Sequence, residues 1–376
     1  MIPYGRHCIE EDDVKAVVSV LRGNDNISDG PKSEELERKL SEYVGTKYAV
    51  VVSSGTAALH AACFVAGLKE GDEVITSPNT FVSTVEAIMY CGAKPVFADI
   101  DSETHNIDPE DIRKKITSKT KAILPVDYAG QPCEFDEIKE IAEEYSLIVI
   151  EDGAEAIGSQ YKEKKIGTIS DMTIFSFHAV KNITTCEGGA IVTDNKNYYE
   201  KLKRFRAYGI DKSTRCEQMP WLVKQTEFGY NYRLSEIQCA MGITQLEKAD
   251  RYIERRTRIA MKYYDGLKEI EQIEVPVIKS YNKTNWYMYV VQVNGIERKK
   301  VWELLKSKGI IAGVCFYPVY KNPYYQQNGF REVRCKVSEI FYENTLSLPC
   351  FPKLSDAEVD QVIDALKEIC KIGFVG

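Results

Sequence analysis

The sequence predicts an α/β protein whose large domain has a mainly parallel central sheet flanked by helices, followed by a smaller α+β domain. Two observations support this fold class. Short apolar runs, several rich in Val and Ile, alternate with amphipathic segments from residue 48 onward. Past a long helical pattern, the order changes to strand, helix, strand and terminal helix. We therefore predict a large domain at residues 1–250 and a small domain at 251–376, with residues 1–20 packing on the small domain.

The apolar runs are predicted to be strands buried on both faces, and the segments between them are long enough to cross back over the sheet as helices. The predicted strands are Tyr48–Val52, Glu73–Thr76, Pro95–Ala98, Ala122–Val126, Leu147–Ile150, Met172–Phe175 and Ala190–Val192. The predicted helices are Glu10–Leu21, Ser33–Val44, Thr56–Leu68, Val82–Cys91, Asp108–Ile116 and Phe135–Tyr145. A charged helical pattern from Leu234 to Gly266 is expected to form one helix that connects the domains. In the small domain we expect strands Trp286–Val293 and Ile310–Cys315 and helices Lys299–Lys308 and Asp356–Ile372.

Composition excludes several classes of protein. The chain has 376 residues, of which 44% are hydrophobic, so it can bury a large core. Its net charge is -7 and its cations are dispersed among acids, which argues against a nucleic-acid partner. It has neither a leader pattern nor an apolar stretch of membrane-spanning length. We expect a soluble, cytoplasmic protein with no membrane partner.

Cysteines and histidines do not indicate disulfides or a metal. The eleven cysteines are an odd number, spread through the chain without a short paired spacing, so we interpret them as reduced thiols. The four histidines stand far apart, and none has a second plausible ligand at metal spacing. No metal site is predicted.

Three segments place polar residues just past predicted strands, where open α/β sheets bind ligands. In the first, Val51–Ala58, a strand breaks into Ser-Ser-Gly-Thr and opens a helix. Backbone amides at such a helix start can hold a phosphate, although the same letters also make an ordinary capped turn. Both interpretations remain open for this segment alone.

The second segment, Ile148–Gly158, is an apolar strand that ends in Glu151 and Asp152. An acid there could bind a ribose or a metal, or could cap a helix. It could equally pair with the ring nitrogen of a pyridine cofactor and keep that nitrogen protonated, as pyridoxal enzymes require.

The third segment, Phe175–Ala190, carries Lys181 just past a strand, among small and hydroxyl residues and before Glu-Gly-Gly. A surface lysine is the ordinary interpretation, but this context favours a functional one. We expect burial to lower the pKa of Lys181, so that the amine forms a Schiff base and moves protons at neutral pH.

A phosphate cradle, a strand-end acid and a desolvated lysine, in this chain order, are the parts of a pyridoxal-phosphate site. With them the chain resembles the sugar-nucleotide aminotransferases of the DegT/StrS type, which are fold type I pyridoxal enzymes. The resemblance covers nearly the whole chain. The matching segments are Gly30-Pro31, Ser53–Leu59, Asp72–Ile75, Thr80–Val82, Pro95–Asp99, Glu151-Asp152, Ser176–Lys181, Thr184–Gly189 and Gly229–Leu234.

The resemblance implies pyridoxal 5'-phosphate as cofactor and a homodimer with shared active sites. It implies that Lys181 forms the covalent link to the cofactor and that Asp152 holds the pyridine nitrogen. Phe81 would stack on the ring, and Glu155 would lie near the cofactor hydroxyl. Phosphate binding is implied for Gly55, Thr56 and Ser176, and for Asn231 toward the neighbouring subunit.

Within the family, the chain looks most similar to aminotransferases of pseudaminic-acid biosynthesis. The cues are Ile2–Arg6, Ala129–Cys133, Ser176–His178 and Ser347–Cys350. This likeness implies amino transfer from L-glutamate to C4 of a UDP-linked 4-keto-6-deoxy-N-acetylhexosamine. Expected substrate-binding residues are Tyr4, Ser28, Asp29, His178, Tyr317 and Tyr320.

Four departures from the family pattern fall on segments expected to line the sugar pocket. Relatives commonly carry Gln or His where Glu155 stands, His where Asp127 stands, and two His where Cys315 and Tyr320 stand. Residues 26–30 replace a commoner Trp-Leu-Thr-Gln-Gly. These departures leave the nucleotide, the sugar and the stereochemistry of the new amine open.

Rival functions predict different behaviour. An aminotransferase for another GDP- or dTDP-linked keto-sugar would share the cofactor chemistry. The pyridoxamine-dependent sugar dehydratases that resemble this family replace the lysine by His, whereas Lys181 is present here. A non-catalytic regulator would bind the cofactor without turnover, and a nucleotide-binding scaffold would be colourless.

Overall fold

A computed structural model describes residues 1–211, 219 and 221–372 of the chain. Its centre is a seven-stranded sheet in the order β1-β9-β8-β5-β4-β2-β3. Only β9 runs antiparallel to its neighbours, which confirms the mainly parallel sheet predicted from the sequence. The strands are β1 (Tyr48–Val52), β2 (Glu73–Thr76), β3 (Lys94–Phe97), β4 (Thr120–Leu124), β5 (Ile148–Asp152), β8 (Met172–Ser176) and β9 (Gly189–Thr193).

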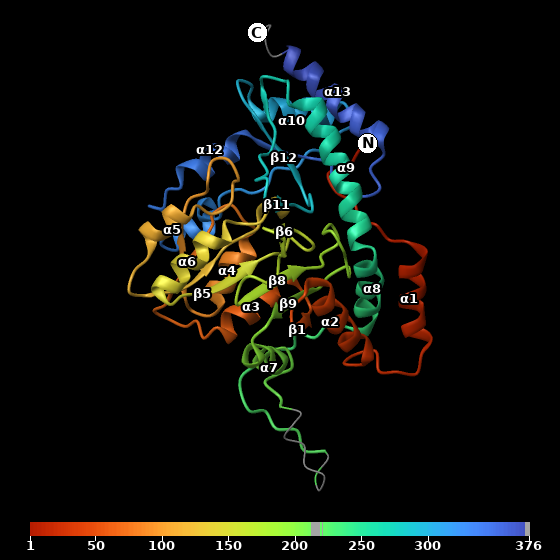
Figure 1. The fold of residues 1–376 in the computed structure, drawn as a ribbon, viewed down its shortest axis with the longest axis vertical. Coiled ribbons are helices and arrows are strands. Elements are labelled where there is room, and N and C mark those ends of the chain that lie inside the picture. Colours follow the sequence, from red (N-terminus) through yellow and green to blue (C-terminus); the bar gives the residue numbers. More distant parts are fainter. Residues whose placement is uncertain (212–218, 220, 373–376) are drawn as a thin grey trace.

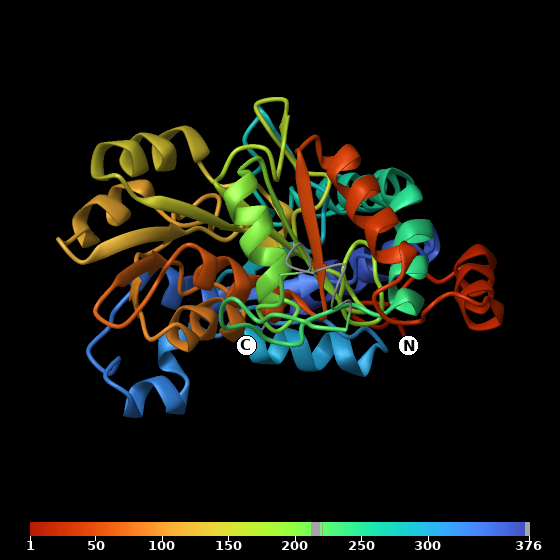
Figure 2. The same ribbon diagram turned by 90° about the horizontal axis from the view of Figure 1, so that it is seen from below.

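Helices cover both faces of this sheet (Figures 1 and 2). One face packs on α2 (Pro31–Val44), α6 (Phe135–Tyr145) and α8 (Glu236–Glu247). The other packs on α3 (Gly55–Val65), α4 (Val82–Tyr90) and α7 (Lys196–Phe205). Alternating strand residues supply the two cores: Val51 faces the first set of helices, and its neighbours Val50 and Val52 face the second.

A second core surrounds the three-stranded sheet β10-β12-β13. Its strands are β10 (Ile273–Glu274), β12 (Tyr289–Val293) and β13 (Thr345–Leu348), and its helices are α10 (Arg298–Ser307), α12 (Lys336–Asn344) and α13 (Asp356–Ile372). The helix α9 (Ala249–Leu267) runs from the large sheet to this core and lies alongside α13 (Figure 1). The remaining elements are α1 (Glu11–Arg22), α5 (Pro109–Lys115), α11 (Pro323–Gln327), the strands β6 (Gln160–Tyr161), β7 (Lys164–Lys165) and β11 (Asn282–Lys283), and the 3₁₀ helices η1 (Tyr128–Gly130) and η3 (Val319–Lys321).

The structure corrects two predicted elements. The expected single helix from Leu234 to Gly266 is two helices, α8 and α9, which meet at Lys248. The expected strand Ile310–Cys315 pairs only at isolated points, Ile310 with Ile2 and Gly313 with Ser347. Its partners come from the chain start and from β13, so the segment has no continuous neighbour along which to form a ladder.

The chain start reaches both cores. Ile2 pairs with Ile310 and is buried in the second core, whereas α1 packs against α8. No helix in the described part of the chain combines the length and apolar character that crossing a lipid bilayer requires.

Candidate active site

Most predicted site residues line one cavity, of about 480 Å³, at the carboxyl-terminal edge of the large sheet. The turns after β1, β5 and β8 and the start of α4 form its floor, as expected where strand ends and helix starts meet. A larger groove of about 860 Å³ runs along α9. We assign the site to the smaller cavity because its lining includes both Lys181 and Asp152. The predicted residues that line it are Tyr4, Gly55, Thr56, Phe81, Asp152, Glu155, Ser176, His178 and Lys181.

One end of the cavity is a helix start suited to an anion. Ser54 caps α3, its hydroxyl oxygen accepting the N–H of Ala57 at 3.0 Å. Gly55 opens the helix, and a Cβ there would lie 3.0 Å from the Cβ and Oγ of Ser176. Glycine therefore lets the β1 and β8 turns close together. The N–H groups of this helix start and the helix dipole favour a phosphate.

Asp152 ends β5 and is almost fully buried. Its Oδ2 accepts the Thr84 hydroxyl at 2.6 Å, and its Oδ1 accepts the Ala154 N–H at 3.2 Å. Thr84 also contacts Thr80 at 2.7 Å, oxygen to oxygen. Burial raises the pKa of Asp152, while these hydrogen bonds and the charge of Lys181 act in the opposite direction. The carboxylate is thus fixed in direction and gains most from a cationic partner in the cavity.

Lys181 forms a largely buried ion pair with Glu155, with Nζ 3.2 Å from Oε1. The other Glu155 oxygen accepts the Ala129 N–H at 2.9 Å. On its other side, the ammonium lies 4.2 Å from the ring centroid of Tyr287. The lysine is therefore held between a carboxylate and an aromatic face.

This pairing reverses the predicted change in lysine basicity. Burial lowers the pKa of Lys181, but Tyr287 and Glu155 together raise it above its ordinary value. Burial raises the pKa of Glu155, and the charge of Lys181 works against that shift. A raised pKa favours the neutral form of Glu155 but the charged form of Lys181. We favour the ionised pair, because at 3.2 Å each charge compensates the burial of the other.

The outer end of the cavity comes from segments distant in the chain. Tyr4 contributes from the chain start, and its hydroxyl lies 3.7 Å from the Cys315 thiol. Phe316 and Phe81 meet edge to face with centroids 6.3 Å apart. His178 lies 3.8 Å from Glu187, and both side chains are about half exposed.

These features fit pyridoxal phosphate. The α3 start with Gly55, Thr56 and Ser176 would hold the phosphate, and Asp152 would face the ring nitrogen. Lys181 points into the same cavity as Asp152 and is near enough to influence its charge. The cavity thus joins an anion cradle, a fixed carboxylate and an amine.

Five predicted residues lie outside this lining within the described chain: Ser28, Asp29, Asn231, Tyr317 and Tyr320. Ser28 is exposed and forms an isolated antiparallel β-bridge with Ser235. Asn231 is exposed, and its side-chain oxygen accepts a hydrogen bond from Arg233 at 3.0 Å. Tyr317 meets Tyr342 edge to face, with ring centroids 5.0 Å apart.

Tyr320 is fully buried, away from the cavity. Its hydroxyl donates to Glu339 at 2.5 Å and accepts the Cys335 N–H at 3.0 Å. The Tyr320 hydroxyl is therefore already bonded within the protein, and its ring is packed in the interior, where a substrate would not contact it.

Asp127 also departs from expectation, because its side chain does not line the pocket. It is fully buried, accepts the Cys133 N–H at 2.9 Å and contacts Glu151. Burial and the neighbouring Glu151 raise the pKa of Asp127 well above its usual range.

The sequence did not predict two contacts within the site, that of Thr84 with Asp152 and that of Tyr287 with Lys181. Thr84 lies in the first turn of α4, a helix that begins directly after the predicted ring-stacking residue Phe81, and this position at a helix start was the available signal. Tyr287 reaches Lys181 from the segment that leads into β12, and no local pattern in the sequence reveals that approach.

Comparisons with known proteins agree with this geometry. The sequence model of the DegT/DnrJ/EryC1/StrS aminotransferase family matches residues 7–367. The chain is 42% identical to an uncharacterized protein of Methanocaldococcus jannaschii, over 98% of this chain and 97% of that protein. It is 38% identical to the spore coat polysaccharide biosynthesis protein SpsC of Bacillus subtilis, with the same coverage of both chains.

Solved structures show the same fold. Helicobacter pylori PseC, described as an aminotransferase involved in the biosynthesis of pseudoaminic acid, superposes with a TM-score of 0.93 at 33% identity over 99% of both chains. The PLP form of the putative sugar aminotransferase Spr1654 of Streptococcus pneumoniae gives 0.93 at 30% identity, also over 99% of both. With a family match over almost its whole length, the chain belongs to the DegT/DnrJ/EryC1/StrS aminotransferases and is a pyridoxal-phosphate-dependent sugar aminotransferase of fold type I.

Proposed function

We propose that this enzyme transfers the amino group of L-glutamate to C4 of a UDP-linked 4-keto-6-deoxy-N-acetylhexosamine, as in a pathway to pseudaminic acid. The observation that carries the proposal is the placement of Lys181 and Asp152 in one cavity, beside a helix start whose free N–H groups suit a phosphate. The likeness to PseC, described as acting in pseudoaminic acid biosynthesis, supports this sugar class.

The proposed chemistry divides between cofactor and protein. Pyridoxal phosphate, when bound, supplies an electron-withdrawing ring that carries the amino group between donor and acceptor. Asp152 keeps positive charge on the ring nitrogen, since its carboxylate is buried and aimed by Thr84. Lys181 takes a proton from the donor carbon and, in the second half-reaction, delivers one to the sugar carbon.

Glu155 gives Lys181 a defined place between these proton transfers. Once the freed amine has taken up a proton, the carboxylate holds the resulting ammonium at 3.2 Å and Tyr287 covers its other side. The amine therefore stays inside the cavity and within reach of the reacting carbon.

We further propose a cytoplasmic homodimer in which Asn231 reaches the cofactor phosphate of the neighbouring subunit. Asn231 is exposed and lies outside its own chain's cavity lining, as such a role requires. The two hydrophobic cores support division into a large and a small domain near residue 250, with α9 joining them. The chain start would belong to both, through Ile2 and α1.

A substrate panel tests the proposed reaction. Purified enzyme with L-glutamate is incubated with UDP-, GDP- and dTDP-linked 4-keto sugars, and product masses are measured. We expect the mass change of a ketone becoming an amine with the UDP-linked N-acetylated sugar. Preference for a GDP- or dTDP-linked sugar would overturn the substrate assignment and keep the reaction type.

The donor half-reaction separates an enzyme from a regulator. Glutamate alone should convert the visible absorbance of the bound cofactor to that of the amino form and release 2-oxoglutarate. An unchanged spectrum would indicate a protein that binds the cofactor without turnover.

A further inference from the structure

The loop that carries Lys181 rests on one face of α8. This lysine loop, residues 178–188, follows β8 and is buried at Asn182 through Thr185. Two glutamines seven residues apart on α8, hence on the same face, bond to its backbone. Gln238 donates to the Glu187 carbonyl at 2.6 Å, and the Gln245 side-chain oxygen accepts the Thr184 N–H at 3.3 Å.

Gly242 lies between the two glutamines and allows this close approach. A Cβ at Gly242 would lie 2.9 Å from the Cγ2 of Thr185 and 2.8 Å from a methyl group of Leu36. The helix therefore offers the loop a flat surface with a hydrogen-bonding side chain on each side of it. Lys181 is three residues from the Gln245 contact.

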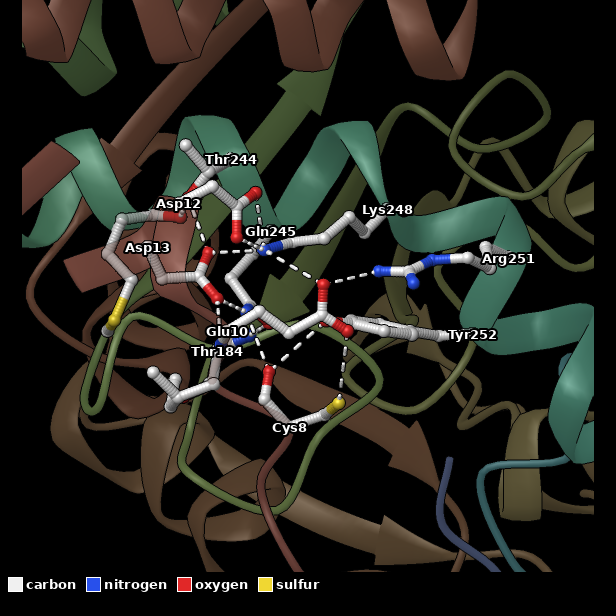
Figure 3. A network of polar contacts seen from close by, with 12 residues as sticks. Cys8, Glu10, Asp12, Asp13, Thr184, Thr244, Gln245, Lys248, Arg251 and Tyr252 are labelled. Atoms are coloured by element: carbon white, nitrogen blue, oxygen red, sulfur yellow. Dashed lines mark hydrogen bonds and ion pairs between the residues drawn. The ribbon is translucent and has the colours of Figure 1, made fainter. Parts of the chain in front are cut away.

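A buried carboxylate fixes the direction of the Gln245 amide. Asp13 is fully buried, and its Oδ2 accepts the Gln245 amide N–H at 2.9 Å (Figure 3). The same amide nitrogen donates to the Cys8 carbonyl at 2.9 Å. Because both of these partners only accept, the amide nitrogen must face them. The amide oxygen is then turned toward the Thr184 N–H, whereas the Thr184 hydroxyl donates to the Phe177 carbonyl.

Asp13 itself is held by groups from α1 and α8. It accepts hydrogen bonds from the Glu10 N–H and the Thr244 hydroxyl, and its Oδ1 lies 2.7 Å from the Lys248 ammonium. Figure 3 shows the side chains of Thr244, Gln245 and Lys248 turned toward this carboxylate from one side. Asp13 is also the only buried residue among those that α1 contributes in the described chain. Its charge therefore has a defined position, and reversing the Gln245 amide would set the amide oxygen against it.

We propose that Asp13 and Gln245 are positioning residues for Lys181. Asp13 orients the Gln245 amide, and that amide holds the lysine loop at Thr184, so that a helix outside the cavity fixes where the reacting amine stands. The inference rests on the proposed function only in giving Lys181 its role. The contacts of Gln245 with the loop stand without it.

The variants Asp13→Asn and Gln245→Met test the relay. Both nearly preserve side-chain volume and remove, respectively, the charge and the amide. Asp12→Asn is the matched control, because Asp12 pairs with the same Lys248 at 2.8 Å but does not contact Gln245 in the described structure. The double variant Asp13→Asn with Gln245→Glu tests rescue, because an asparagine donor would then face a glutamate acceptor.

Amide exchange at Thr184, resolved by mass spectrometry or NMR, is the direct readout and does not depend on activity. We expect exchange about tenfold faster in Asp13→Asn and Gln245→Met, the factor expected for loss of one buried hydrogen bond. In Asp12→Asn it should stay near wild type. Gln245→Glu alone should be the most disturbed, and adding Asp13→Asn should restore part of the protection, because the Cys8 carbonyl still faces a carboxylate oxygen.

Kinetics supply the second readout. Misplacement of Lys181 should lower kcat of the donor half-reaction by about 10- to 100-fold in Asp13→Asn and Gln245→Met, with little change in KM for glutamate. If both variants match Asp12→Asn in exchange and in kcat, the relay is wrong. If Gln245→Met fails to fold, the comparison of Asp13→Asn with Asp12→Asn decides. Faster exchange with unchanged kcat would keep the loop contact and overturn the positioning of Lys181.

Discussion

The two ends of the active-site cavity are built differently. At the inner end, Asp152, Glu155 and Lys181 come from strand ends and the turns that follow them. The two acids are buried, the Lys181 side chain is 15% exposed, and each charged group has a partner. At the outer end, Phe81 is 59% exposed and the His178 side chain 48% exposed. The fixed residues of the inner end define the reaction type. Residues at the outer end can be substituted with little loss of fold stability, and such substitutions can change which substrate binds.

The largest effect is expected from Lys181→Ala at the inner end. The change removes the covalent link to the cofactor and a proton relay that alone contributes about 10²- to 10⁴-fold. Turnover of glutamate and keto-sugar, followed by product mass, is the measurement. Turnover at the wild-type rate would remove Lys181 from the mechanism.

Asp152→Asn should come next. The amide keeps the shape of the side chain but loses the negative charge that keeps the ring nitrogen protonated. The pKa of that nitrogen should fall by about 1 to 3 units, which corresponds to about 10- to 10³-fold in rate. Thr84→Ala, which removes only one hydrogen bond to that carboxylate, should cost about tenfold. If Thr84→Ala lowers kcat in the Asp152→Asn background as much as in the wild-type enzyme, Thr84 does not act through Asp152.

Glu155→Gln should alter the pH dependence of the lysine. Glu155 raises the pKa of Lys181, so its removal must lower that pKa and supply neutral amine at lower pH. In protein without cofactor, Lys181 should then be acylated about tenfold faster near pH 9, the factor for one pKa unit. Mass spectrometry of the labelled peptide reports the rate. Slower labelling in the variant would show that the carboxylate does not stabilise the ammonium.

The smallest effect is expected at the outer end. His178→Ala removes a half-exposed contact, so KM for the sugar nucleotide should rise by less than about tenfold, with the glutamate half-reaction unchanged. Separate kinetics of the two half-reactions provide the check, with Glu187→Gln as the matched control for the surface pair. A loss in the donor half-reaction would place His178 in the cofactor chemistry.

The sequence was most informative at the inner end. Asp152 and Lys181 follow apolar runs, and strand ends of a parallel sheet share one edge, so local pattern places them together. The resemblance added the cofactor. The direction of the lysine pKa shift was predicted wrongly because Tyr287, in the segment before β12, is 106 residues away in the chain and carries no local signal.

The outer end was less predictable for the same reason. Tyr4 meets Cys315 across 311 residues, a contact that needs the packing of the chain start on the second core. Tyr320 was expected to contact the substrate, but its hydroxyl donates to Glu339 and accepts the Cys335 N–H. The helix break at Lys248 was also missed, because the helical pattern of the sequence continues through a position whose side chain pairs with Asp12 and Asp13.

The most direct test of this account is to identify the lysine that bonds to the cofactor. Borohydride reduction of the pyridoxal-phosphate-loaded enzyme, followed by peptide mass spectrometry, should place the pyridoxyl group on Lys181 alone. Prior treatment with glutamate should abolish that labelling, because the cofactor would then carry the amino group. Labelling of another lysine, or labelling that glutamate leaves unchanged, would contradict the assignment of Lys181 as the residue that exchanges with the amino donor.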